Sequence, residues 1–160
     1  MQTEKLKFKI ELCATWWLSP PVAEIKINDT SKFKSEITGT EENPTVVEFE
    51  HELTEGEKYN LIVVRSGKTI QHTVLDKEGN ITKDQLLHIK SIEIDEIDVG
   101  SLIFEGIYTP IYSQPWHQQQ VDAGTPPRVS FKNTTALGHN GTYVLAFESP
   151  FYMWLLENLY

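Results

Sequence analysis

Apolar and polar residues alternate along most of the chain with a period of two, which is the pattern of half-buried β-strands. Between residues 5 and 13, leucine, phenylalanine and isoleucine side chains face one side and lysines and Glu11 face the other. Further strands are predicted at 23–27 and, more weakly, at 32–38. The stretch 45–65 contains two alternating runs around a polar turn, which favours a hairpin.

The middle of the chain continues this rhythm and then loses it. Strands are expected at 69–75, 86–94 and 99–104. The apolar parity shifts at Lys90-Ser91, as it does at a β-bulge. Apolar periodicity then disappears over 105–135, where prolines, aromatics and glutamines gather. We expect a long irregular loop there, or two loops around a short strand at 128–131.

The C-terminal stretch is the most apolar part of the sequence. His139-Asn140-Gly141 is a turn signal and a strand is expected at 142–147. Ser149 then suits the N-cap of a helix and Pro150 its first position. The turns that follow are apolar almost all round, so they must be buried in the protein or against a partner.

Roughly eight to ten short strands, with turn signals about every ten residues, are typical of an all-β sandwich. We therefore predict one antiparallel, jelly-roll-like β-sandwich domain over residues 1–160, with the irregular loop around 105–135 and a short C-terminal helix or turn. A chain of 160 residues is the size of one ordinary domain.

The charge balance narrows the choice of partners. The formal net charge is −9, which disfavours binding to nucleic acid or to an anionic membrane surface. No apolar run approaches transmembrane length, and the N-terminal residues lack a signal region, so synthesis in the cytoplasm is expected. A single cysteine, Cys13, rules out an intrachain disulfide, and we expect it to be buried.

Motifs for catalysis are missing from the sequence. None of the five histidines lies at metal-ligand spacing from another, and neither a nucleophile elbow nor a glycine-rich phosphate loop occurs. An acidic cluster could hold Ca²⁺ or could simply be a solvated turn; it consists of Glu93, Asp95, Glu96 and Asp98. We therefore expect a protein that is not an enzyme and has no cofactor, with Ca²⁺ as an alternative.

The segment from Tyr108 to Gln120 combines aromatic rings with side-chain amides. Such rings could pin the loop to its own sheet, anchor a protein–protein contact or stack on a sugar. The candidate contact residues are Tyr108, Tyr112, Trp116, His117 and Gln119 in this segment, and Trp154 and Tyr160 in the C-terminal tail.

The run from Gly138 to Glu157 resembles the ending of small virion-associated proteins of marine tailed phages. The segment 76–112, with Asp84 before the strand at 86–94, is similar to them in rhythm. Those proteins in turn resemble carbohydrate-binding modules, including calcium-dependent ones.

The resemblance implies a structural component of the tail, neck or head surface of a virion, in contact with other virion proteins in several copies. It also implies an alternative, a carbohydrate-binding module for adhesion to the host surface with a glycan as partner and Ca²⁺ as a cofactor. A polysaccharide-active enzyme is a second alternative, although nothing in the sequence places two carboxylates across a cleft.

Overall fold

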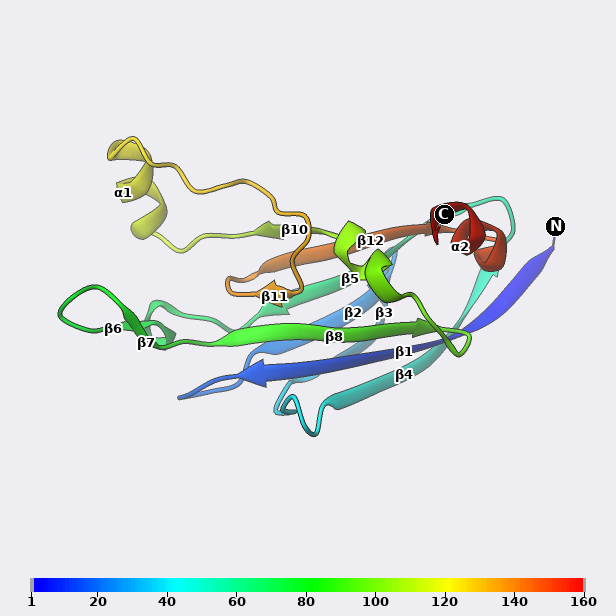
Figure 1. Ribbon diagram of the computed structural model, residues 1–160, viewed down its shortest axis with the longest axis horizontal. Coiled ribbons are helices and arrows are strands. Elements are labelled where there is room, and N and C mark those ends of the chain that lie inside the picture. The colour runs from blue at the N-terminus through cyan, green and yellow to red at the C-terminus, as the bar shows by residue number, and fades with distance from the viewer. Residues whose placement is uncertain (1, 160) are drawn as a thin grey trace.

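The computed structural model describes residues 2–159 as two antiparallel sheets of five strands each that face one another (Figure 1). The first sheet has the order β11-β8-β1-β4, with β9 beside β8; it contains β1 (Thr3–Thr15), β4 (Thr45–Thr54), β8 (Leu86–Ile94), β9 (Ile97–Asp98) and β11 (Ala136–Leu137). The second has the order β10-β12-β5-β2-β3; it contains β2 (Val22–Ile27), β3 (Thr30–Glu36), β5 (Lys58–Ser66), β10 (Ile107–Pro110) and β12 (Gly141–Glu148). The predicted antiparallel β-sandwich is confirmed.

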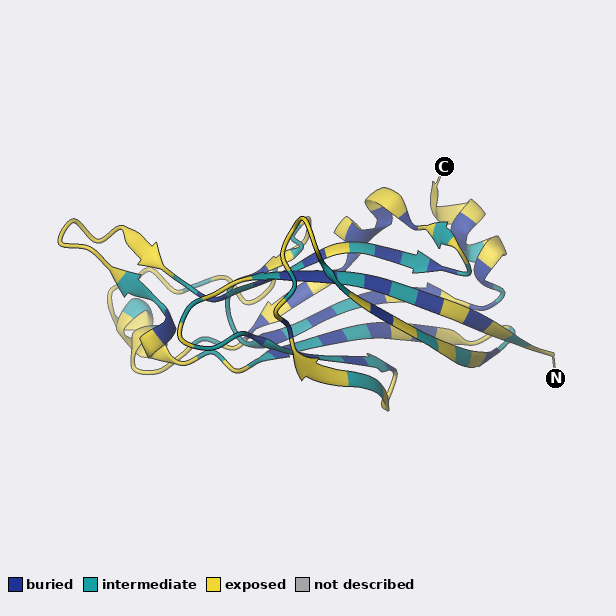
Figure 2. Ribbon diagram, turned by 90° about the horizontal axis from the view of Figure 1, so that it is seen from below, coloured by how far each residue is buried: buried dark blue, intermediate teal, exposed yellow. Residues whose placement is uncertain are grey.

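The core lies between the sheets and follows the alternation in the sequence. Figure 2 shows buried residues alternating with intermediate or exposed ones along the long strands. On β1, Leu6, Phe8 and Ile10 are at most 2% exposed. The ring centroid of Phe8 lies 6.1 Å from that of Phe147 on β12, which joins the two layers. Burial of this continuous apolar layer is the main force that holds the sheets together.

The hairpin predicted at 45–65 is wrong. β4 pairs with β1 in the first sheet, whereas β5 pairs with β2 and β12 in the second. The short connection crosses between the sheets, where the Thr54 N–H donates to the Tyr59 hydroxyl over 2.7 Å and the Gly56 N–H donates to the Ser149 carbonyl over 2.8 Å. Both strands alternate because each buries one face, and that pattern is the same in a hairpin and in a crossing between sheets.

The predicted bulge near Lys90 is confirmed. Glu11 on β1 pairs with Ser91, but the next residue, Leu12, pairs with Ile89, so Lys90 has no partner in the ladder. The extra residue restores the inward orientation of the isoleucines on both sides of it.

Two of the predicted strands are largely 3₁₀ helices. The stretch 69–75 contains η1 (Ile70–His72) and the short β6 (Val74–Leu75), which pairs with β7 (Ile81–Lys83) in a small separate hairpin. Of the stretch 99–104, all but Val99 lies in η2 (Gly100–Glu105). Side chains stabilise both turns locally, because His72 Nδ1 accepts the Thr69 N–H over 2.9 Å and Asp98 accepts the Gly100 N–H over 2.7 Å.

The region 105–135 is more ordered than predicted. It contains β10 and a short helix, α1 (Trp116–Asp122), and Phe131 forms an isolated bridge with Tyr108 in the region expected to hold a short strand. The Gln114 side chain accepts the Gln118 N–H over 3.1 Å in the first turn of α1, an interaction that the apolar pattern does not signal.

The expected C-terminal helix is present as α2 (Phe151–Leu159), but it begins one residue after Pro150, and the Ser149 hydroxyl bonds to another part of the chain. The Ser149 hydroxyl donates to the carboxylate of Glu4 on β1, and the same carboxylate accepts the Phe151 N–H over 2.8 Å. Phe151 is fully buried, whereas Met153 is 60% exposed, so only one side of this apolar helix is covered. Within residues 2–159, no helix is both long enough and apolar enough to cross a membrane.

Candidate functional site

A cavity is lined by residues of the β6–β7 hairpin, of α1 and of the turn at 138–140. Figure 1 shows that these elements lie at the end of the sandwich opposite α2. The cavity has a volume of about 490 Å³, and we call it the end pocket. Its polar and aromatic lining comes from segments far apart in the sequence: Lys68, Thr69, Thr73, Asp84, Tyr112, Ser113, Trp116, Gly138, His139 and Asn140. Its aliphatic lining, Ile70, Leu75, Ile81 and Ile111, is 58–67% exposed.

Aromatic rings form one wall of the end pocket. The ring of His139 lies edge-on to Tyr112 at 4.9 Å and nearly parallel to Trp116 at 6.1 Å between centroids. The Trp116 side chain still has 40% of its surface exposed. These rings support one another in offset and edge-to-face arrangements, so the indole presents a fixed apolar surface to a ligand.

An ion pair lies beside this wall. Lys68 Nζ is 2.9 Å from Asp84 Oδ1, and the two side chains are only 12% and 18% exposed. Burial alone would raise the pKa of Asp84, but hydrogen bonds from Lys68, the Gln85 N–H and the Thr73 hydroxyl outweigh it and lower the pKa. The carboxyl group is therefore ionised at neutral pH.

A buried arginine holds the surrounding segments together. Arg65, at the end of β5, is 1% exposed and donates to the carbonyls of Gln85 and Leu137 over 2.5 and 3.3 Å and to Asn140 Oδ1 over 2.9 Å. Desolvation lowers the pKa of Arg65 to about 10, so the guanidinium keeps its charge at neutral pH. Its rigid fork fixes three strand ends at one point.

The turn at 138–140 is held from both sides. The Asn140 amide pairs with the Lys68 backbone, accepting its N–H and donating to its carbonyl, both over 3.0 Å. The Tyr108 hydroxyl accepts the His139 N–H over 2.9 Å and donates to the His139 carbonyl. Burial, together with the charges of Lys68 and Arg65, lowers the pKa of His139, so its ring is neutral at pH 7.

The structure brings two of the predicted contact residues, Tyr112 and Trp116, into the end pocket. Tyr108 is 3% exposed, so no ligand can reach its ring, and it acts by holding the turn at 138–140 through its hydroxyl. His117 packs against Tyr112 at 5.6 Å outside the pocket lining, and Gln119 is exposed on α1.

Of the two predicted tail residues, Trp154 lies at the far end, against Phe147 and Phe151. Tyr160 lies outside the described residues.

Sequence reasoning missed the polar half of the site, namely Arg65, Lys68, Asp84, His139 and Asn140. One signal for it was present. Along β5, Tyr59, Leu61 and Val63 are buried in alternation, and Arg65 occupies the next inward position. A cation at a core position indicates a buried network of acceptors, because a buried charge without partners is costly.

The structure also contains a close serine–histidine pair. Ser19 Oγ lies 2.8 Å from Nε2 of the buried His72. Because Nδ1 accepts the Thr69 N–H, the ring proton of the neutral imidazole is on Nε2, and the ring donates to Ser19. A histidine in this state cannot take the proton of the serine, so the pair stabilises the loop and does not form an activated nucleophile.

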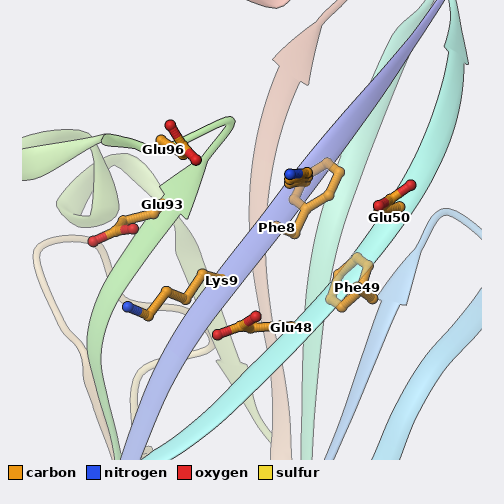
Figure 3. A pocket seen from close by; sticks show the side chains of 8 residues that line it. Phe8, Lys9, Glu48, Phe49, Glu50, Glu93 and Glu96 are labelled. Atoms are coloured by element: carbon orange, nitrogen blue, oxygen red, sulfur yellow. The ribbon is translucent and has the colours of Figure 1, made fainter.

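A second hollow, of about 530 Å³, lies on the outer face of the first sheet. Figure 3 shows Lys9 on β1 between Glu48 on β4 and Glu93 on β8, which are its partners in the register of the sheet. Rows of opposite charge across neighbouring strands are a common way to stabilise a solvated sheet face. Phe8 and Phe49 also line this hollow and stack on each other at 5.1 Å between ring centroids, but Phe8 is 1% exposed and its ring belongs to the core.

The carboxylates of the acidic cluster considered for Ca²⁺ do not point to a common site. Asp95 accepts the Tyr152 hydroxyl and Asp98 accepts the Gly100 N–H. Across the described part of the chain, no three His, Cys, Asp or Glu side chains lie close enough together to hold a metal ion.

No known family model matches this sequence, and no curated protein matches it. Among solved structures, the calcium-dependent carbohydrate-binding module vCBM60 is similar with a TM-score of 0.47 and 7% identity, covering 88% of this chain and 89% of that one. The same module in complex with galactobiose gives a TM-score of 0.47 and 9% identity, covering 87% and 96%. Similarity at this level establishes neither a family nor a ligand for this chain.

Proposed function

We propose that this protein is a non-catalytic carbohydrate-binding protein that holds its sugar in the end pocket. One observation carries the proposal: the exposed ring of Trp116 and the Lys68–Asp84 ion pair line the same cavity. A sugar has apolar C–H faces that pack on aromatic rings and hydroxyl groups that need directional donors and acceptors. The end pocket offers both kinds of surface.

The size and charge of the pocket agree with such a ligand. Its volume of about 490 Å³ falls within the ~300–1,000 Å³ that is usual for small-molecule sites. The charges of Lys68 and Asp84 offset each other, and the His139 ring is neutral.

Glycan-array screening followed by calorimetric titration with the array hit tests the proposal. We expect Trp116→Ala to weaken binding about tenfold or more, because loss of an aromatic contact removes on the order of 1 kcal/mol or more. Trp16→Ala is the matched control, since Trp16 is 43% exposed and lies outside the pocket lining. Equal sugar affinities of the two variants, or no binding to any glycan on a broad array, would contradict the proposal.

Ca²⁺ is a separate question for the same titration. Asp84 is the one carboxylate among the described lining residues, and its Oδ1 is engaged by Lys68, whereas Ca²⁺ takes six to eight oxygen ligands. We therefore place the direct sugar contacts on side chains, and titration with and without a chelator separates this arrangement from a calcium-mediated one.

The exposed side of α2 favours a second candidate, a structural role in a larger assembly. Met153 and Leu156 are 60% and 63% exposed, on a helix whose other side is buried. Under this candidate, the chain is made in the host cytoplasm and is incorporated in several copies into a phage particle, a context that rests on the sequence resemblance. Loss of particle incorporation in Leu156→Asp, with the fold intact, would support it.

A further inference from the structure

The two oxygens of the Asp84 carboxylate have different surroundings. Oδ1 accepts three donors, namely Lys68 Nζ at 2.9 Å, the Gln85 N–H at 2.8 Å and the Thr73 hydroxyl at 2.9 Å. Oδ2 has no hydrogen-bond partner among residues 2–159. Gln85 Oε1 is the one fully buried side-chain N or O atom without a partner in that part of the chain, so Oδ2 keeps some exposed surface. The wall of the end pocket therefore presents a charged acceptor that the fold itself does not use.

Lys68 has an unused hydrogen-bond donor next to this acceptor. Its ammonium group carries three hydrogens, of which one is directed to Asp84 Oδ1 and one to the Gly138 carbonyl at 2.6 Å. In the described structure the third hydrogen has no acceptor. One ion pair thus offers a free acceptor and a free donor side by side, and both groups are fixed by their other bonds.

We infer that this ion pair recognises two neighbouring hydroxyl groups of an uncharged sugar, which deepens, and rests on, the function proposed above. One hydroxyl donates to Asp84 Oδ2, and the adjacent hydroxyl accepts from Lys68 Nζ. The apolar face of the same sugar lies on the Trp116 side of the pocket. Each polar group of the protein then gains the partner that it lacks in the free state.

Charge selects against acidic and basic sugars. A ligand carboxylate could accept from Lys68 but would be repelled by the adjacent Asp84 Oδ2, and a ligand ammonium group could donate to Asp84 but would be repelled by Lys68. Arg65 adds a positive charge behind this layer, but it is 1% exposed and its fork is already bonded to Gln85, Leu137 and Asn140. The groups that reach the cavity therefore suit hydroxyls best.

The experiment compares neutral, uronic-acid, sialylated and amino sugars on one array, and then titrates the wild-type protein with the hit and with two analogues that each lack one of the paired hydroxyls. We expect the protein to bind neutral sugars. The affinity for each deoxy analogue should be about tenfold lower, since a hydrogen bond to a charged group contributes about 1.5 kcal/mol or more. Because these arms use the unaltered protein, they do not depend on how well a variant folds.

Asp84→Asn and Lys68→Met test the same contacts from the protein side, with Glu78→Gln as the control carboxylate on the tip of the β6–β7 hairpin. We expect the affinity of the two pocket variants for the sugar to fall about tenfold and that of the control to equal the wild-type affinity. Two results would overturn this inference and leave the proposed function standing. One is a preference for an acidic sugar. The other is wild-type affinity both for the deoxy analogues and in Asp84→Asn, while Trp116→Ala abolishes sugar binding. An array without any hit would overturn both the inference and the proposed function.

Discussion

At the scale of single residues, the end pocket depends on charged groups whose partners are within the protein. Arg65 satisfies two backbone carbonyls and one amide, and Asp84 joins Lys68, Gln85 and Thr73. The bonds of Arg65 tie the end of β5 to the segment before β8 and to the turn between β11 and β12. The site is therefore formed before any ligand arrives, which lowers the entropic cost of binding.

Acid should weaken the fold through Asp84. The hydrogen bonds in the native state hold the pKa of this carboxyl below its ordinary value, so near that ordinary value, about 3.9, the unfolded chain binds more protons. The stabilisation is present above that pH and is lost as the pH falls through the lower, folded-state pKa.

We expect Asp84→Asn to unfold about 1–3 kcal/mol more easily than the wild type at pH 7, and this gap to shrink as the pH falls below about 4. Urea denaturation of both proteins over a pH series measures it. A gap that stays constant down to pH 3 would show that Asp84 contributes nothing through its charge.

At the scale of elements, the sequence predicts best where burial alone decides the structure. β1, β2, β8 and β12 were predictable because each buries alternate side chains, and the bulge at Lys90 was predictable because it shifts that alternation. The pairing of β4 and β5 was not, since a strand has the same pattern whichever sheet contains it. The turns η1 and η2 depend on local side-chain bonds from His72 and Asp98, which leave no periodic signature.

The helix α2 should contribute to stability through one side only. Phe151 is fully buried and contacts Trp154 at 6.0 Å between ring centroids, so we expect Phe151→Ala to lower the free energy of unfolding by about 3–5 kcal/mol. Met153→Ala, on the exposed side, should change it by less than about 0.5 kcal/mol. Chemical denaturation compares the two.

Similar losses in the Phe151 and Met153 variants would mean that the exposed side of α2 is already covered in solution. That outcome would favour the assembly role over the description of α2 as a half-buried closing element.

At the scale of the whole molecule, the two functional candidates occupy opposite ends of the sandwich. The end pocket is lined by residues of α1 and of the β6–β7 hairpin, and α2 lies at the other end (Figure 1). A carbohydrate site and an assembly surface could therefore coexist without competition. Changes to α2 that preserve the fold should leave sugar affinity unaltered.

This arrangement also explains how little of the site was visible in the sequence. Tyr112 and Trp116 stand out because aromatic residues in a proline-rich segment are conspicuous. Lys68, Asp84 and His139 lie in ordinary turns, and only the sheet order brings them to the same cavity. The aromatic character of Trp154 marked it as a contact candidate, but it is half-buried against Phe147 and Phe151 at the far end.

The most direct test of the central claim is an NMR titration of isotope-labelled protein with the neutral sugar selected on the array, followed through its amide and indole N–H signals. The account predicts saturable shifts at the Trp116 indole, the Asn140 side-chain amide and the Lys68 backbone amide. Saturable shifts confined to α2 or to the outer face of the first sheet would contradict it.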